Sequence, residues 1–155
     1  MKTTVKLQAI IDGTEMQFDN FRTFLNIKTS EIISVSLEDL IAAEDGESFD
    51  DLLDWQQEER MAAIDIVEHY GQYVKLPSKY DANDYDIMED FCLSITDPQK
   101  RNRLLRAIQG KGAFRRFKNT IMDFGLAEQW YSYRSERYKE IAIDWCRDHD
   151  INFIE

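Results

Sequence analysis

The sequence predicts an α+β fold that is predominantly helical, with a small antiparallel hairpin or three-stranded sheet in the N-terminal half and a C-terminal helical bundle. A hairpin pattern lies within residues 23–35, and apolar residues recur at intervals of three and four through most of the chain after residue 54. The 155 residues are 43% hydrophobic, which suffices for one self-contained core. We therefore expect a single domain over residues 1–155.

The N-terminal half supplies the strands. Residues 5–16 fit either the alternation of a strand or one face of a helix, and we favour the helix. Residues 23–27 and 32–35 are β-branched and aromatic segments around the polar turn KTSE, which predicts a hairpin. Because a lone hairpin is only marginally stable in water, we expect a third strand at residues 73–76.

Two capping patterns predict the first helices after the hairpin. Ser36 followed by Asp39 resembles a capping box and starts a short helix that Gly46 ends. Asp54, with Gln57 three residues later, is expected to cap a helix that runs to about Tyr70 and turns Tyr70 inward.

The remaining chain predicts further helices. Helical spacing of apolar residues covers residues 87–95, Asp97 before a proline is expected to cap the next helix, and Gly110 and Gly112 separate that helix from its successor. A last helix extends over about residues 126–149. The expected core includes Phe91, Leu105, Ile108, Phe114, Phe117, Trp130, Ile141 and Trp145.

Charge is segregated along the chain. The net charge is −11, so the summed field repels nucleic acid and anionic lipid, and any nucleic-acid role needs a local basic patch. Residues 1–97 carry 22 acidic and 7 basic side chains, whereas residues 98–118 carry eight basic side chains and no acidic one. The basic segment is therefore the place to look for a binding site.

The cysteines and the hydropathy indicate the cellular compartment in which the protein is expected to reside. Cys92 and Cys146 lie in apolar helical segments without a CxxC pattern or a Cys/His cluster, which favours two buried free thiols in a reducing cytosol. We find neither a signal peptide nor an uninterrupted apolar segment of about 18 residues. We expect a cytoplasmic protein that does not contact a membrane.

The segment AIQGKGAFRRFKNTI, residues 107–121, contains closely spaced glycines and a lysine but matches neither of two known phosphate-binding motifs. Lys111 is followed by Gly rather than Ser or Thr, and position 115 is Arg where a dinucleotide fingerprint needs Gly. Three hypotheses remain for its basic side chains: they dock on the acidic part of the same molecule, bind an acidic protein, or bind an external anion such as nucleic acid. The candidate residues for anion or partner binding are Arg103, Arg106, Lys111, Arg115, Arg116, Lys118 and Arg134.

Arg134 belongs to this set although it lies within a stripe of the last helix that we expect to be core, formed by Tyr131, Tyr138, Ile141, Ala142 and Trp145. A guanidinium there must be paired, stacked on a ring or extended to solvent. We expect a carboxylate partner from residues 81–90, with a bound phosphate as the alternative.

Those carboxylates raise a further hypothesis. Asp86 and Asp90 share a helical face, which allows a metal-assisted or acid–base site, although acidic side chains at a helix start are also favoured by the helix dipole. No nucleophile or metalloprotease motif accompanies them. We expect no catalytic residues, no metal ion and no cofactor.

Several strings together resemble one family. LPSKYDANDYDIMEDFC, RLLRAIQGKGAFRRFK and YRSERYKEIAIDW look like the uncharacterised bacterial protein family 0158, over about residues 75–150. The hairpin FLNIKTSEII is similar too, but this chain has Ser30 where family members tend to have Gly, which would adopt a left-handed turn without strain. The resemblance implies a small cytosolic bacterial protein and supplies no catalytic residues. We expect a non-enzymatic protein-binding or regulatory module, with phosphate or nucleic-acid binding through residues 100–118 as the alternative.

Overall fold

The computed structural model describes residues 4–155 and confirms the α+β class. The contacts divide the chain into two compact units, residues 1–78 with 142–155 and residues 79–141. The prediction of a single folding domain stays a prediction. The elements are β1 (Thr4–Lys6), α1 (Leu7–Glu15), β2 (Phe21–Asn26), β3 (Ile32–Ser36), α2 (Leu37–Asp45), α3 (Asp54–Glu68), the 3₁₀ turn η1 (Tyr70–Gln72), β4 (Tyr73–Lys75), α4 (Asp84–Ser94), α5 (Pro98–Ala107), α6 (Ala113–Asp123), α7 (Ala127–Asp148) and β5 (Asn152–Ile154).

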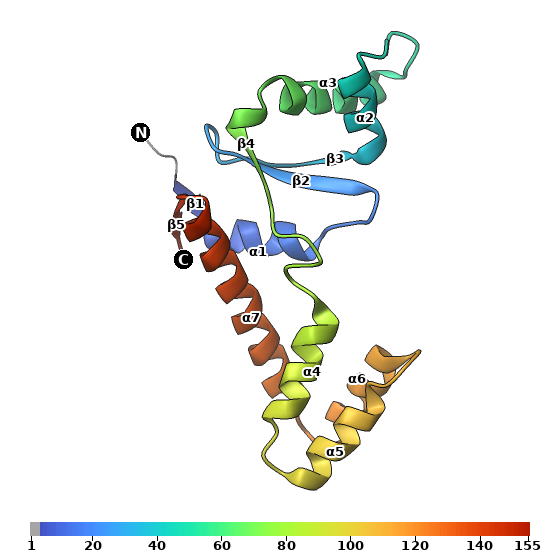
Figure 1. The fold of residues 1–155 in the computed structure, drawn as a ribbon, viewed down its shortest axis with the longest axis vertical. Coiled ribbons are helices and arrows are strands. Elements are labelled where there is room, and N and C mark those ends of the chain that lie inside the picture. The colour runs from blue at the N-terminus through green and yellow to red at the C-terminus, as the bar shows by residue number, and fades with distance from the viewer. Residues whose placement is uncertain (1–3) are drawn as a thin grey trace. The chain divides into compact units, whose positions relative to one another are not determined.

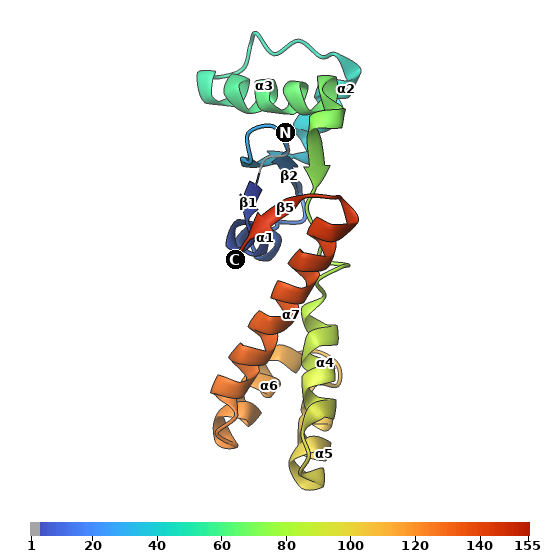
Figure 2. The same cartoon turned by 90° about the vertical axis from the view of Figure 1, so that its left-hand side faces the viewer.

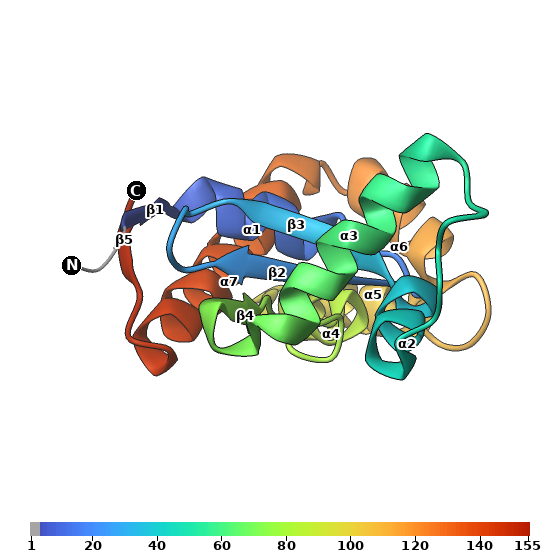
Figure 3. The same cartoon turned by 90° about the horizontal axis from the view of Figure 1, so that it is seen from above.

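The first unit is built around the predicted three-stranded antiparallel sheet, with strand order β3-β2-β4. Helices α2 and α3 cover one face of this sheet and α1 lies against the other (Figure 1). Seen from above, α3 crosses the strands (Figure 3). The favoured helix within residues 5–16 is confirmed, as are the hairpin and the third strand.

The period of two along β2 sends alternate side chains into two separate cores. Phe24 packs with Val35, Ala63, Ile66 and Tyr73 under α3. On the opposite face, Leu25 joins a cluster with Val5, Leu7, Ile10, Leu76, Ala142, Trp145 and Cys146. The sheet is therefore buried on both faces.

A short parallel pair, β1 with β5, joins the two ends of the described chain (Figure 2). Val5 lies opposite Phe153 in this pair, and both contribute to the cluster around Trp145. No sequence pattern predicts this pairing, because each strand is only three residues long and its partner lies at the other end of the chain.

The predicted cap of α2 is confirmed, whereas the predicted cap of α3 is wrong. The Ser36 hydroxyl accepts from the Asp39 amide at 3.0 Å, as predicted, and Gly46 ends α2 in the left-handed conformation. The cap predicted at Asp54 is wrong: α3 begins at Asp54 itself, and the Gln56 side chain accepts from the Leu53 amide. α3 also ends before Tyr70, whose side chain is exposed rather than inward.

The second unit consists of α4, α5, α6 and the first part of α7, around an aromatic cluster. The Phe91 ring meets the rings of Phe117, Trp130 and Tyr133 edge-on, with centroids 5.4–6.1 Å apart. Edge-to-face pairs of this kind stabilise by about 0.5–1.5 kcal/mol beyond their buried area. The predicted helical bundle is therefore held by aromatic packing.

Most of the predicted core is buried, with two errors. Phe114 is 45% exposed and Tyr131 is 59% exposed. The inward face of α6 is the row Ala113, Phe117 and Ile121 at intervals of four, and Phe114 lies three residues from Phe117, about 60° around the helix. In addition, Leu105 and Ile141 are half-buried rather than buried.

Candidate functional site

The basic segment forms a helical hairpin of α5 and α6, which we call the basic hairpin (residues 98–124). Asp97 caps α5 as predicted, accepting from the amides of Gln99 and Lys100, and Pro98 occupies the first turn. Gly110 and Gly112 both have positive φ in the connection, so the glycines separate the two helices as expected. The inner faces are buried through Leu104, Ile108, Phe117 and Ile121.

Arg116 holds this connection together. Its Nε donates to the carbonyl oxygen of Ala107 at 2.8 Å, and its two terminal nitrogens donate to the carbonyls of Lys111 and Gln109. These carbonyls at and beyond the end of α5 would otherwise need water as a donor. Arg116 is thus a structural residue of the hairpin, and its guanidinium is already occupied.

Arg103 lies at the other end of the hairpin, over an aromatic ring. Its guanidinium carbon is 5.5 Å from the centroid of the Phe124 ring, and the Lys100 ammonium is 5.7 Å from the same centroid. These cation–π contacts tie α5 to the end of α6. Arg103 is nevertheless exposed, whereas Lys100 is half-buried.

The remaining four candidates on the hairpin are Arg106, Lys111, Arg115 and Lys118. All four are exposed, and none of them has an ion pair with another residue in the range 4–155. The hairpin as a whole carries eight basic side chains and one acidic side chain, Asp123. The hypothesis that this surface docks on the acidic part of the same chain stays a prediction.

The start of α6 is also electrostatically unfavourable for its own sequence. Its first turn contains no acidic side chain, and Gly112 provides no side-chain cap. Arg115 lies in this turn, where the helix dipole is positive. A cation there costs rather than contributes stability, by a few tenths of a kcal/mol.

Arg134 is separate from the hairpin and is paired, which confirms the predicted carboxylate partner from residues 81–90. Its Nε lies 3.3 Å from Asp84 Oδ1, and its guanidinium carbon is 4.4 Å from the centroid of the Tyr138 ring. Tyr138 also donates to Asp84 at 2.8 Å. The cluster ties α7 to the start of α4.

A second cluster of the same kind joins the same two helices, three residues further along α7 and six residues further along α4. Arg137 Nη1 contacts Asp90 Oδ2 at 2.8 Å and the Tyr133 hydroxyl at 3.1 Å. The hydrogen bond with Asp90 is the main reason that the pKa of Arg137 is raised. The acidic segment thus supplies partners for arginines of α7, and no group of three or more His, Cys, Asp or Glu side chains within residues 4–155 is arranged to hold a metal ion.

The first unit contains a feature that no sequence motif marks, a cavity of about 310 Å³ between the sheet and helices α2 and α3. Its charged lining residues are Arg22, Lys75 and Glu44. The signal in the sequence is faint: Arg22 and Phe24 share one face of a strand by alternation. Lys75 lies beside Arg22 and Phe24 only because β4 pairs with β2.

Comparisons with known proteins support the family resemblance that the sequence motifs indicate. No described helix is long and apolar enough to cross a membrane. A UPF0158 protein of Pseudomonas aeruginosa is 36% identical to the chain over 66 residues, which are 42% of this chain and 43% of that protein. The chain thus aligns with less than half of that relative's length. No solved structure matches the chain. The model of the uncharacterised protein family UPF0158 matches residues 3–155, and the chain therefore belongs to this family.

Proposed function

We propose that this chain is a non-enzymatic, cytoplasmic protein-binding module, and that the basic hairpin is the surface that contacts an acidic partner protein. The observation that carries the proposal is the exposure of Arg106, Lys111, Arg115 and Lys118 without an ion pair within residues 4–155. Carboxylates of a partner would offset both the repulsion among these cations and the unfavourable interaction of Arg115 with the helix dipole.

The surroundings of these charges favour a protein over a nucleic acid. Phe114 and Met122 are exposed on α6, at 45% and 70%. Apolar side chains among basic ones suit an acidic segment that also carries apolar residues. The net charge of −11 repels any polyanion at long range, so recognition of either kind of partner depends on the local basic surface. Phosphate or nucleic-acid binding through the same residues is the alternative.

The test measures the fluorescence anisotropy of two labelled probes of equal net charge, a peptide of alternating Glu and Leu and a single-stranded RNA. We expect the wild-type chain to bind the peptide more tightly, with an affinity that falls as salt rises. The variant Arg115→Gln/Lys118→Gln should weaken peptide binding about tenfold, the scale expected for losing two charge contacts at a binding surface.

A matched control removes two exposed cations from the first unit, Lys6→Gln/Arg147→Gln. It should leave the peptide affinity within about twofold, because neither charge belongs to the basic hairpin. Tighter binding of the RNA, lost in the hairpin variant, would favour the alternative. No binding of either probe, with a lower unfolding free energy of the hairpin variant, would favour internal docking and reject the proposal.

A further inference from the structure

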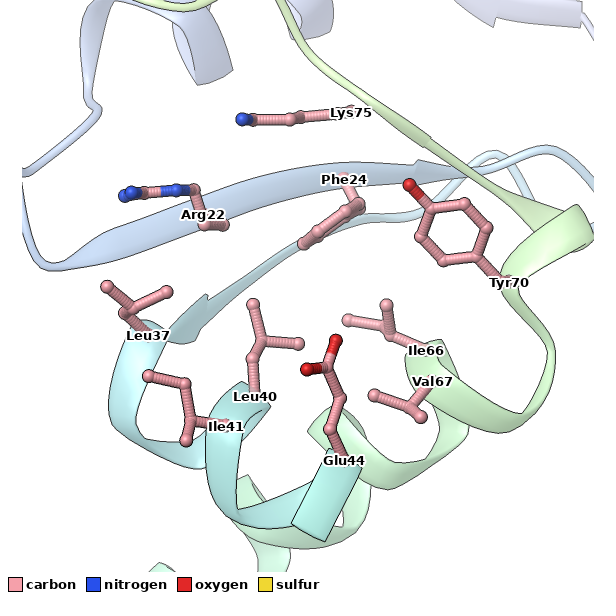
Figure 4. Close-up of a pocket in the computed structure, with 10 residues that line it drawn as sticks. All are labelled: Arg22, Phe24, Leu37, Leu40, Ile41, Glu44, Ile66, Val67, Tyr70 and Lys75. Carbon is pink, nitrogen blue, oxygen red and sulfur yellow. The ribbon is translucent and has the colours of Figure 1, made fainter.

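The cavity of the first unit has the size and lining of a small-molecule site. Its volume is about 310 Å³, at the lower end of the range of about 300–1,000 Å³ that is usual for such sites. The walls are partly apolar and partly polar, and they come from the sheet, α2 and the end of α3 (Figure 4). The apolar lining residues are Phe24, Leu37, Leu40, Ile41, Ile66 and Val67.

Two cations share one face of the sheet beside this apolar surface. Lys75 is the direct partner of Phe24 in the pairing of β2 with β4, and Arg22 lies two residues before Phe24 on the same strand. Diagonal neighbours on one sheet face are about 7–8 Å apart. Figure 4 shows both charged ends extending in the same direction. A carboxylate group placed beside these ends would be attracted by both cations.

Neither cation is neutralised by the part of the chain that the structure describes. Nη1 of Arg22 donates to the carbonyls of Asp19 and Phe21, at 3.0 and 2.9 Å. Within residues 4–155, the other nitrogens of Arg22 and the ammonium of Lys75 have no hydrogen bond or ion pair. The two charges repel each other, so an anion between them would be stabilised.

A carboxylate enters the cavity from the opposite wall. Glu44 on α2 directs its carboxyl group toward Phe24, next to Leu40 and Ile66 (Figure 4). This carboxylate has no ion pair within the described residues either. It lies in the last turn of α2, where the helix dipole disfavours a negative charge. Its position therefore gains nothing from the helix and is suited to a cationic group in the cavity.

We propose that this cavity binds a free α-amino acid with an aliphatic side chain. The carboxylate of the ligand contacts Arg22 and Lys75, its ammonium contacts Glu44, and its side chain packs on Phe24 and Ile66. A zwitterion satisfies both charged walls at once, whereas a simple carboxylic acid leaves Glu44 unpaired and an amine leaves the two cations unpaired. The site is independent of the basic hairpin and of the proposed partner.

The experiment titrates three probes of one shape into the full chain and follows amide chemical shifts in NMR spectra: L-leucine, 4-methylpentanoate without the amine, and 3-methylbutylamine without the carboxylate. We expect leucine to bind with a dissociation constant of about 1 mM or lower, as is reasonable for so small a ligand. Each truncated probe should bind at least about fivefold more weakly.

Charge variants assign the two ends of the ligand. Lys75→Gln should weaken leucine and 4-methylpentanoate about fivefold and leave the amine unchanged, whereas Glu44→Gln should weaken leucine and the amine and leave 4-methylpentanoate unchanged. Ile41→Trp, at a half-exposed position of the lining, should fill the cavity and abolish binding of all three probes. Lys6→Gln, on an exposed edge of the same unit, is the control and should bind leucine like the wild type.

Three results would overturn the proposal. The first is the absence of any leucine-dependent shift at about 20 mM, some twentyfold above the expected dissociation constant. The second is equal affinity for leucine and 4-methylpentanoate, and the third is unchanged leucine binding in Ile41→Trp. Because α2, α3 and the sheet also give amide signals, the spectra show directly whether each variant is folded. The basic-hairpin variant Arg115→Gln/Lys118→Gln should bind leucine normally, so that failure of the protein-binding proposal is distinguishable from failure of this one.

Discussion

One position in each compact unit illustrates a different use of a basic side chain, Arg60 in the first unit and Arg115 in the second. In the first unit Arg60 is buried at 7% exposure, and its Nε lies 2.9 Å from Asp39 Oδ1 on the neighbouring helix. In the second unit Arg115 and Lys118 are exposed and have no such partner within residues 4–155. A buried pair is costly to break, whereas an exposed cation contributes little to folding. The comparison separates charges that hold the fold from charges that are free to bind.

The largest effect should come from the aromatic core of the second unit. Phe117 is 1% exposed, and its ring lies 4.9 Å from that of Trp130. Phe117→Ala should lower the free energy of unfolding by about 4 kcal/mol, because it removes buried surface and leaves a cavity. The matched variant Phe114→Ala should change it by less than about 1 kcal/mol, since that side chain is half exposed. Urea denaturation measures both values, and similar losses would contradict the packing of α6.

The next effect should come from the buried ion pair of the first unit. Asp39→Ala leaves the Arg60 guanidinium buried without its partner and should cost about 3 kcal/mol. Glu38→Ala removes an exposed carboxylate from the same first turn of α2 and controls for the helix dipole. It should cost less than about 1 kcal/mol. If both variants lost the same stability, the Arg60–Asp39 pair would not be the reason.

Local patterns account for these elements to different degrees. The hairpin, the caps at Ser36 and Asp97 and the partner of Arg134 could be predicted, because each depends on neighbouring residues or on a charge that must be compensated. The pairing of β1 with β5 could not, since it joins three residues at each end of the chain. Phe114 was misplaced because intervals of three and four fit two adjacent helical rows equally well.

The candidate sites divide in the same way. The basic segment is visible in the sequence as a run of charge, but the sequence does not show which of its side chains are structural. Arg116 donates to three carbonyl groups only because the chain reverses at Gly110 and Gly112. The cavity is invisible to local patterns, because Lys75 meets Arg22 and Phe24 only through strand pairing. Contacts between distant segments thus limit what the sequence can predict.

Each unit also contains one buried thiol, which allows the units to be compared in a single molecule. Burial raises the pKa of Cys92 and of Cys146 to about 11, from an ordinary value of 9.0. At pH 8 both thiols of the folded chain are therefore protonated and covered, and a thiol reagent reacts only after opening. If the predicted single domain is correct, both cysteines should be labelled with the same opening free energy, and Phe117→Ala should accelerate both equally.

The raised pKa values also predict a pH dependence. Below about pH 9 the thiols are protonated in both the folded and the unfolded chain, so their contribution to stability is fully present. As the pH rises toward 11, the unfolded thiols ionise first and stability falls. Urea denaturation at pH 8 and pH 10 should show a smaller fall in the Cys92→Ala/Cys146→Ala variant than in the wild type; an equal fall would exclude the thiols as its cause.

The smallest effect concerns a turn residue that differs between the units. Both glycines of the basic hairpin have positive φ, whereas the turn between β2 and β3 places Ser30 at φ 64°. A left-handed conformation costs a side chain other than glycine about 1 kcal/mol or more. The Ser30 hydroxyl donates to the Thr4 carbonyl at 3.2 Å, but this bond is exposed and offsets little.

Ser30→Gly should therefore raise the free energy of unfolding by about 0.5–1 kcal/mol, while Gly112→Ala should lower it by about 1 kcal/mol or more. The second substitution also brings the new Cβ within 3.0 Å of Arg116 Nη1, the group that holds the α5–α6 connection. Thermal unfolding of the two variants beside the wild type measures the difference. Destabilisation by Ser30→Gly would mean that the bond to Thr4, which links the hairpin turn to β1, outweighs the backbone strain.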